Sequence, residues 1–170
     1  MLIRAERPGD VDAIDVVHND AFADDHGEGP PPEVGLVRLL RAGEAWIPAQ
    51  SLLAVVDDEI VGHCLCTRAH VNDTPALALG PIGVVSGHRG RGVGSALINT
   101  AIDIAGEMGE SIIGLLGDNM FYERFGFVTA ASVGIEPPDP AWGRYFQVRL
   151  LDGRRVSGVF AYPAPFAVVS

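Results

Sequence analysis

The sequence predicts an α+β fold with a mixed sheet, formed by one domain that spans residues 1–170. Two observations carry this prediction. Three extended segments over residues 51–85 follow one another with short turns between them, which indicates an antiparallel meander. Residues 76–116 then follow the order strand, loop, helix and strand, a unit that normally makes a right-handed parallel crossover.

The first 50 residues are predicted to form one short strand and two helices. Residues 2–4 make the opening strand, and Pro8-Gly9-Asp10 begins the first helix. An acidic loop rich in proline and glycine covers residues 24–33, and the second helix follows it and ends near Gly43. The apolar stripe of the first helix consists of Val11, Ile14, Val17 and Phe22.

The middle of the chain supplies most of the expected sheet. Residues 51–56 and 60–70 form a hairpin around an acidic turn. Residues 76–85 are apolar on both faces, which is typical of a strand in the middle of a sheet. A helix over residues 93–107 and a further apolar strand over residues 111–116 complete the crossover unit.

The last third of the chain is predicted to contain a short helix and the remaining strands. The helix covers residues 119–125, and Asp118 is placed to accept its free N–H groups as the N-cap. Phe127 begins another extended segment, residues 136–140 form a loop, and late strands follow over residues 146–151 and 159–161.

Composition excludes several classes of protein. The 22 acidic and 12 basic residues give a net charge of −10, and every basic residue is arginine. This acidic balance argues against a nucleic-acid partner, which needs clustered cations, and weakly favours a neutral or cationic substrate. No apolar run reaches the roughly 18 residues of a membrane span, and the first residues lack the apolar stretch of a signal peptide. We therefore expect a cytoplasmic protein with no membrane association.

Cys64 and Cys66 are expected to be structural. On a strand they point to the same face, while His63 points to the other, so the three do not form a metal site. A disulfide across one intervening residue is disfavoured by geometry. We interpret both cysteines as small buried apolar side chains and expect no metal.

The most informative segment is the glycine loop Gly87-His-Arg-Gly-Arg-Gly-Val-Gly94, which joins an apolar strand to a helix. Glycine allows the tight turn and lets backbone N–H groups approach a ligand. The N-terminus of the following helix adds free donors and the positive end of its dipole. Arg89 and Arg91 add positive charge, so the loop is suited to a diphosphate.

Three other interpretations of this loop are weaker. The dinucleotide fingerprint Gly-x-Gly-x-x-Gly finds serine, Ser95, at its last position, and the loop follows several strands instead of the first. A phosphate-binding loop of the Walker type requires lysine, which the chain lacks. A turn that binds nothing has little need for four glycines and two arginines in eight residues.

Two motifs together resemble the GNAT acetyltransferases. Arg89-x-x-Gly92-x-Gly94 is similar to the coenzyme-A loop of that family, Gln/Arg-x-x-Gly-x-Gly/Ala. After the next strand, Tyr122-Glu-Arg-Phe-Gly126-Phe127 resembles the family element Tyr-Glu-x-x-Gly-Phe. A finer similarity, to a bacterial subgroup of N-acetyltransferases, rests on Leu79–Ile82, Leu116–Phe127 and Tyr162–Phe166.

The resemblance implies an enzyme and a site. The fold would be a mostly antiparallel mixed sheet of about six to seven strands flanked by about four helices, as the family has. The activity would be N-acetyl transfer from acetyl-CoA, as cosubstrate, to a small amine or a peptide amine by direct attack on the thioester. Backbone N–H groups of the loop and helix start would hold the pyrophosphate, namely those of Arg89, Gly90, Arg91, Gly92, Val93, Gly94 and Ser95.

The resemblance also assigns the reacting end of the cosubstrate. The segment Ile82-Gly83-Val84 would pair with the pantetheine arm as an added strand. The Val84 N–H would stabilise the charge that develops on the thioester oxygen, and Tyr122 would protonate the departing thiolate. Dimers are common in the family, so a homodimer is a further expectation, although the sequence identifies no interface.

The general base stays unassigned. Many family members carry a glutamate on the strand before the loop, whereas residues 76–85 contain no ionisable side chain. An amine needs help, because its neutral form at pH 7 lies roughly 4.6 kcal/mol uphill for a pKa of about 10.4. The candidates are water and six side chains, those of His63, His70, Asp20, Asp24, Asp25 and His26.

The missing strand carboxylate leaves two other functions open. The chain could bind acyl-CoA without catalysis, or, with less support, bind a nucleotide. Turnover would separate an enzyme from a binding module, and the ligand that binds most tightly would identify a nucleotide-binding protein. The sequence does not identify the acceptor or the preferred acyl chain.

Overall fold

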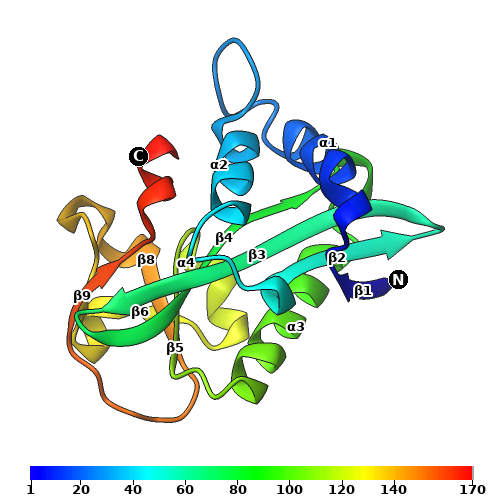
Figure 1. Ribbon diagram of the computed structural model, residues 1–170. Coiled ribbons are helices and arrows are strands. Elements are labelled where there is room, and N and C mark those ends of the chain that lie inside the picture. Colours follow the sequence, from blue (N-terminus) through cyan, green and yellow to red (C-terminus); the bar gives the residue numbers. More distant parts are fainter. Residues whose placement is uncertain (170) are drawn as a thin grey trace.

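The computed structural model describes residues 1–169, in which nine strands form one mixed sheet with helices on both faces (Figure 1). Seven of the strands follow the order β1-β2-β3-β4-β5-β8-β6, and β9 pairs with both β3 and β7. All pairs along the seven-strand path are antiparallel except β4 with β5. The strands are β1 Leu2–Ala5, β2 Ser51–Val56, β3 Glu59–Val71, β4 Thr74–Val84, β5 Ile112–Leu116, β6 Val128–Thr129, β7 Ile135–Glu136, β8 Phe146–Leu150 and β9 Gly158–Ala161.

The helices also follow the expected order. Four α-helices lie within residues 1–169, together with several short 3-10 turns. They are α1 Val11–Ala21, α2 Pro32–Arg41, α3 Val93–Glu107 and α4 Asn119–Tyr122. None of the helices in this part of the chain is long and apolar enough to span a bilayer.

The predicted α+β class and mixed sheet are confirmed, and the sheet has more strands than the expected six to seven. The additional pairing comes from short segments: β6 and β7 have two residues each. β7 lies partly in the segment that was expected to be a loop, residues 136–140. Two residues are too few to show an alternating pattern, so only their pairing partners reveal them as strands.

The two faces of the sheet pack against different helices. Leu53 and Leu65 pack with α1 and α2, and the neighbouring Leu52 and Cys64 pack with α3. Successive strand residues point to opposite faces, which is why adjacent positions belong to different cores. Cys64 and Cys66 are buried free thiols on the α3 face, as expected.

A bulge in β4 separates β4 from β5, the one parallel pair along the seven-strand path. β4 pairs with β5 at Leu77 and Ala78, and the pairing stops there. One residue later the register between β3 and β4 shifts, so that the Cys64–Cys66 segment lies opposite Leu79–Ile82. Gly80 and Pro81 together lie opposite the single residue Leu65, so β4 carries one extra residue, and a bulge bends the strand that carries it. The end of β4 therefore runs beside β3 alone.

Candidate active site

The end of β4 presents an open backbone edge. Val84 pairs with Gly62 of β3, and the N–H of Val85 donates to the carbonyl of Val61 at 2.9 Å. Because successive N–H groups of a strand point to opposite edges, the Val84 N–H points away from β3. On that side the ladder with β5 has already ended. Ile82 and Val84 thus direct backbone groups into the opening between the two strands, where an extended ligand could pair with them.

The glycine loop lies directly after this edge and remains exposed. Gly90 and Gly92 have left-handed φ values of 72° and 81°, which glycine adopts without strain. Gly92 is the N-cap of α3, and the first backbone bond of the helix runs from Ala96 N–H to the Gly92 carbonyl at 3.0 Å. The N–H groups at the start of α3 precede that bond, so the helix itself does not use them. They can receive an anion.

The last turn of α1 holds the loop in place. The Asp20 carboxylate accepts a hydrogen bond from the Ser86 N–H and another from the Ser86 hydroxyl at 3.3 Å. The Arg89 guanidinium donates to the Ala21 carbonyl at 2.8 Å. Asp20, one of the candidate bases, is therefore engaged with the loop, and Arg89 is tied to α1 while it contributes positive charge.

Tyr122 stands across the opening from β4, on α4. Asp118 caps this helix by accepting the Met120 N–H at 3.0 Å, as predicted. The ring packs edge-on against Phe121 and Phe127 with centroids 5.0 and 5.9 Å away. Burial is the largest cause that raises the pKa of Tyr122 to about 12. The phenol consequently stays protonated at every physiological pH and acts as a hydrogen-bond donor.

A cavity of about 920 Å³ lies between Tyr122 and the bulge of β4. We call it the main cavity. Phe22, just after α1, and Glu33 of α2 line it, and the end of β5 contributes Leu116. The opposite wall is aromatic and comes from the last third of the chain, with the three residues Trp142, Tyr162 and Phe166. The volume lies within the range of pockets that bind small molecules.

A second, smaller cavity of about 330 Å³ adjoins the first along β4. It is lined by the segment Ile82-Gly83-Val84, by Arg89 and by the candidate bases Asp24 and Asp25. Phe22 and Ile82 line both cavities. The two hollows are thus neighbours on β4, one beside the glycine loop and the other beside Tyr122.

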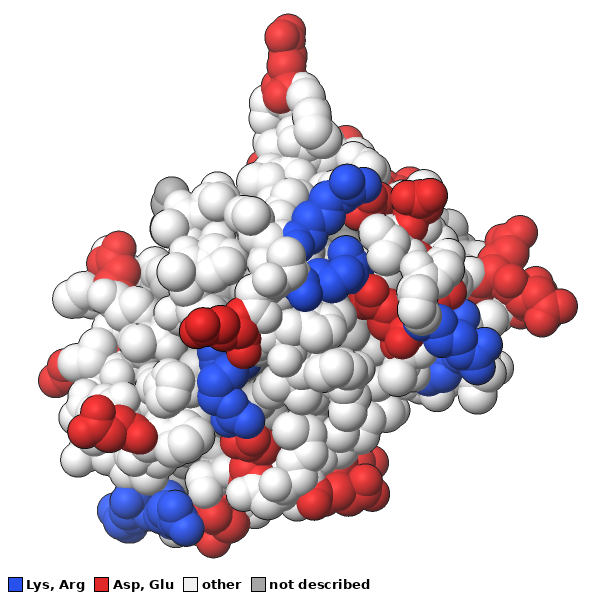
Figure 2. All heavy atoms as spheres, in the orientation of Figure 1, with Lys and Arg blue, Asp and Glu red and all other residues white. Residues whose placement is uncertain are grey.

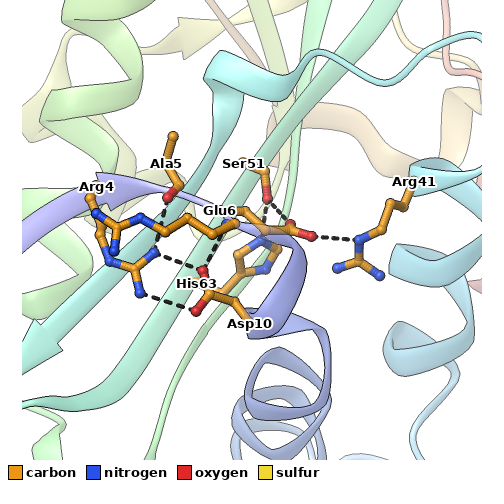
Figure 3. A network of polar contacts seen from close by, with 8 residues as sticks. Arg4, Ala5, Glu6, Asp10, Arg41, Ser51 and His63 are labelled. Atoms are coloured by element: carbon orange, nitrogen blue, oxygen red, sulfur yellow. Dashed lines mark hydrogen bonds and ion pairs between the residues drawn. The ribbon is translucent and has the colours of Figure 1, made fainter.

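His63, another candidate base, is part of a buried network. Its Nε2 lies 2.9 Å from the Ser51 hydroxyl, which donates to Glu6, and Arg41 reaches the same carboxylate at 2.6 Å (Figure 3). Its Nδ1 lies 2.8 Å from Nε2 of His18. Burial lowers the pKa of His63 well below its ordinary value. His63 lines neither cavity, so direct contact with an acceptor would require a rearrangement.

The remaining candidate bases lie outside both cavities. His70 is exposed on the part of β3 that pairs with β9. His26 lies in the segment between α1 and α2, which projects from the body with acidic side chains at its tip (Figure 2). This acidic projection stands beside the main cavity, because Phe22 and Glu33 at its two ends line that cavity.

The sequence did not single out the carboxylates of the main cavity. Glu33 was only the last residue of the acidic loop, and Asp139 was part of an expected loop. A local signal existed for Asp139, which precedes Pro140 and caps the following turn by accepting the Ala141 N–H at 2.9 Å. No local signal places Glu33 in a cavity with residues more than 100 positions away.

Comparisons with known proteins agree with this geometry. A profile of the acetyltransferase (GNAT) family matches residues 16–127. The uncharacterized N-acetyltransferase YhbS of Escherichia coli K12 is 30% identical over 162 residues, which are 94% of this chain and 92% of that protein. The uncharacterized N-acetyltransferase YjhQ of the same strain is 39% identical over 103 residues, 58% of this chain. The chain spans only 57% of the length of YjhQ.

Two solved structures share the fold over nearly the whole chain. The GNAT family N-acetyltransferase YhbS of Escherichia coli, in complex with CoA, superposes with a TM-score of 0.86 and 28% identity, covering 98% of this chain and 91% of that one. A GNAT family acetyltransferase from Brucella melitensis, in complex with acetyl-CoA, has a TM-score of 0.79 and 29% identity, with 97% of each chain covered.

Proposed function

The chain belongs to the GNAT family of acetyltransferases, and from this premise we propose that it transfers the acetyl group of acetyl-CoA to a primary amine. The structures of similar proteins in complex with CoA and acetyl-CoA support acetyl-CoA as the donor. Amine nitrogen attacks the thioester carbon, a C–N bond forms, the C–S bond breaks and CoA leaves as its thiol. The nitrogen gives up a proton, and the sulfur receives one.

One observation carries the proposal: β4 parts from β5 after Ala78, and Tyr122 faces the gap that results. In this arrangement an extended ligand can pair with β4 while its end lies beside a phenol. The backbone groups of Ile82 and Val84 would bind the pantetheine arm, with Gly83 between them. The Val84 N–H would donate to the thioester oxygen, where negative charge develops during attack.

The glycine loop fits the charged part of the same ligand. The backbone N–H groups of residues 89–95 are the donors that we assign to the pyrophosphate, and they combine the turn of Gly90 and Gly92 with the N-terminus of α3. A side chain at Gly92 would be strained by its positive φ. Arg89 and Arg91 add the positive charge that the acidic remainder of the chain does not supply.

Tyr122 is assigned to the leaving thiolate. A phenol with a pKa of about 12 is a much weaker acid than a thiol near 8.5, so full proton transfer would cost about 5 kcal/mol. We therefore assign to Tyr122 a hydrogen bond to the sulfur, which stabilises the developing thiolate until solvent supplies a proton. The phenol keeps its own proton throughout.

The proposal is tested by thermal unfolding with acetyl-CoA, with NAD and ATP as controls, followed by assay of CoA release with a panel of amines. A ligand at about 100 times its Kd adds roughly 2.7 kcal/mol to the free energy of unfolding, a shift of about 5–11 °C for a domain of this size. We expect the shift with acetyl-CoA and not with the nucleotides. A shift without CoA release for any amine would contradict the transferase and favour a binding module.

A further inference from the structure

We propose that the main cavity selects a small primary amine with one positive charge and a flat apolar body, and that Glu33 binds its ammonium group before that nitrogen loses a proton to water and attacks the thioester. This inference rests on the proposed function and names the acceptor class for it. Three observations carry it: an unpaired carboxylate, an aromatic wall, and a β4 wall without charge.

Glu33 is a half-buried carboxylate without a partner. No residue among 1–169 donates a hydrogen bond to its side chain or forms an ion pair with it. By contrast, two other acidic side chains of this region form ion pairs: the buried Asp15 with Arg38, and the half-buried Glu6 with Arg41. Glu33 lies in the first turn of α2, at the positive end of the helix dipole. A partly buried negative charge that faces a cavity is best satisfied by a cation from the ligand.

The charge in the main cavity matches a single cation. Of the described residues that line it, only Glu33 and Asp139 carry a charge at neutral pH, and none of them is a cation. Asp139 is exposed and already accepts the Ala141 N–H, so Glu33 is the carboxylate free to bind an ammonium. A ligand with three or more positive charges would leave cations without partners against an apolar surface, which is costly.

The opposite wall favours a flat apolar body. Tyr162 contacts Trp142 and Phe166 with ring centroids 5.9 and 4.7 Å away, so the three rings form one surface. Phe22, the residue after α1, adds a fourth ring and is itself held by stacking on His18, with ring centroids 5.8 Å apart. Aromatic surfaces of this kind bind rings and broad apolar groups with specific geometry.

The β4 wall explains why α2 supplies the carboxylate. Gly80 lines the main cavity, and a side chain placed there would point toward Phe166, which lies 4.0 Å from the ideal Cβ position. The neighbouring Leu79, Pro81 and Ile82 are all apolar. Since β4 brings no charge to this space, recognition of an ammonium group falls to Glu33 on the facing helix.

The test compares three amines as acceptors for acetyl-CoA: 2-phenylethylamine, spermidine and a short lysine-containing peptide. We expect kcat/KM to be at least about tenfold higher for 2-phenylethylamine than for either of the others. Faster acetylation of spermidine or the peptide would overturn the inference and leave the proposed function standing. Acetyl-CoA binding without transfer to any of the three would contradict the inference, and the same result across the whole amine panel would contradict the proposed function as well.

Glu33→Gln tests the carboxylate directly, with Glu44→Gln as the matched control, since Glu44 is exposed and lines neither cavity. We expect Glu33→Gln to raise the KM for 2-phenylethylamine by about tenfold or more, because a hydrogen bond to a charged group is lost. The KM for acetyl-CoA should change little, and Glu33→Asp should recover part of the loss. A fall in kcat at unchanged KM, or equal effects of both Gln variants, would overturn the assignment. Tm measurements on each variant show that it is folded.

Discussion

Nε2 of His18 lies 2.8 Å from Nδ1 of His63, and neither imidazole has any exposed surface. The hydrogen bonds around the pair determine where the protons are. The Ser51 hydroxyl donates to Glu6, so it accepts from Nε2–H of His63. Nδ1 of His63 then accepts from Nε2–H of His18, and Nδ1 of His18 is left as a buried acceptor without a partner among the described residues.

This chain of hydrogen bonds runs from Glu6 and Ser51 through His63 to His18, which lies beside the edge of β4 that we assign to acetyl-CoA. His18 lies against Gly83: an ideal Cβ on that glycine would be 3.0 Å from Nδ1 of His18. Gly83 is thus the residue that lets α1 pack closely against β4 between Ile82 and Val84. The network ends at Glu6, which Arg41 holds from α2. Two helices, two strands and Glu6 therefore share one network of buried polar contacts.

Acid should destabilise the fold through these histidines. Burial is the main cause that lowers the pKa of His18 from 6.5 to about 4, with Asp15 opposing the shift and Arg41 adding to it. Between these two values the unfolded chain binds a proton that the folded chain does not, so the free energy of unfolding falls as pH decreases from 6.5 to 4. The loss from His18 is on the order of 3 kcal/mol, and His63 acts in the same direction.

Urea unfolding at pH 7 and pH 4.5 measures this loss. His18→Gln keeps a donor toward His63 but removes one titrating group, so its stability should change less between the two pH values than that of the wild type. His70→Gln, at an exposed position, is the control and should follow the wild type. Equal pH dependence in wild type and His18→Gln would show that the pair does not control acid stability.

Alanine variants of two glycines, at opposite ends of α3, distinguish a loss of ligand binding from the cost of backbone strain. Gly92 and Gly109 have φ values of 81° and 78°, and neither has an atom within 4 Å of its ideal Cβ. Alanine at either position should cost about 1–2 kcal/mol of stability for the left-handed conformation. Only Gly92→Ala should also weaken acetyl-CoA binding, by about tenfold, because its Cβ lies in the proposed pyrophosphate site. Calorimetric titration with acetyl-CoA measures this, and equal affinities for the two variants would refute the loop assignment.

Tyr122→Phe should separate catalysis from binding. Removing the phenol takes away the hydrogen bond to the leaving sulfur, and we expect kcat to fall about 10- to 100-fold while the KM for acetyl-CoA changes less than threefold. Tyr145→Phe, an exposed tyrosine that lines neither cavity, is the control. Steady-state assays of CoA release measure both variants. A wild-type kcat for Tyr122→Phe would remove Tyr122 from the mechanism.

Gly117 sets the position of the Tyr122 ring. An ideal Cβ at Gly117 would be 2.6 Å from Cε2 of Tyr122, so Gly117→Ala must displace the ring. We expect kcat to fall about tenfold with the phenol still present. Gly106→Ala on α3 is the control, because it has nothing within 4 Å and removes a glycine from a helix. Should Gly117→Ala keep full activity, the exact position of the phenol would not matter for turnover.

Much of the fold was predictable because its signals are local. The glycine loop, the start of α3 and the Asp118 cap depend on residues within a few positions of one another, and the structure confirms them. The bulge at Gly80 and Pro81 had a local signal that the prediction of an unbroken strand over residues 76–85 did not use. Proline lacks an N–H and cannot stay in the middle of a regular strand, so the pair indicated a break.

The pairing of distant residues was not predictable in the same way. His18 looked like an ordinary residue of an amphipathic helix, and only the packing of α1 over β3 brings it to His63, 45 positions later. Glu33, Trp142 and Phe166 come from three elements and meet only in the main cavity. No pattern in a single sequence predicts that these residues lie close together, because the local sequence around each of them would look the same in a fold that kept them apart.

The sequence by itself determined the order of elements, the glycine loop before α3 and the family resemblance, since these depend on spacing along the chain. The tertiary structure alone decided which histidines are buried together and which carboxylate faces the main cavity. The physical reason is that burial and charge pairing depend on all the elements packed around a group. Glu33 illustrates both contributions. The local sequence of residues 32–41 is enough to predict its helix, but only the folded structure shows that its carboxylate faces the main cavity without a partner among residues 1–169.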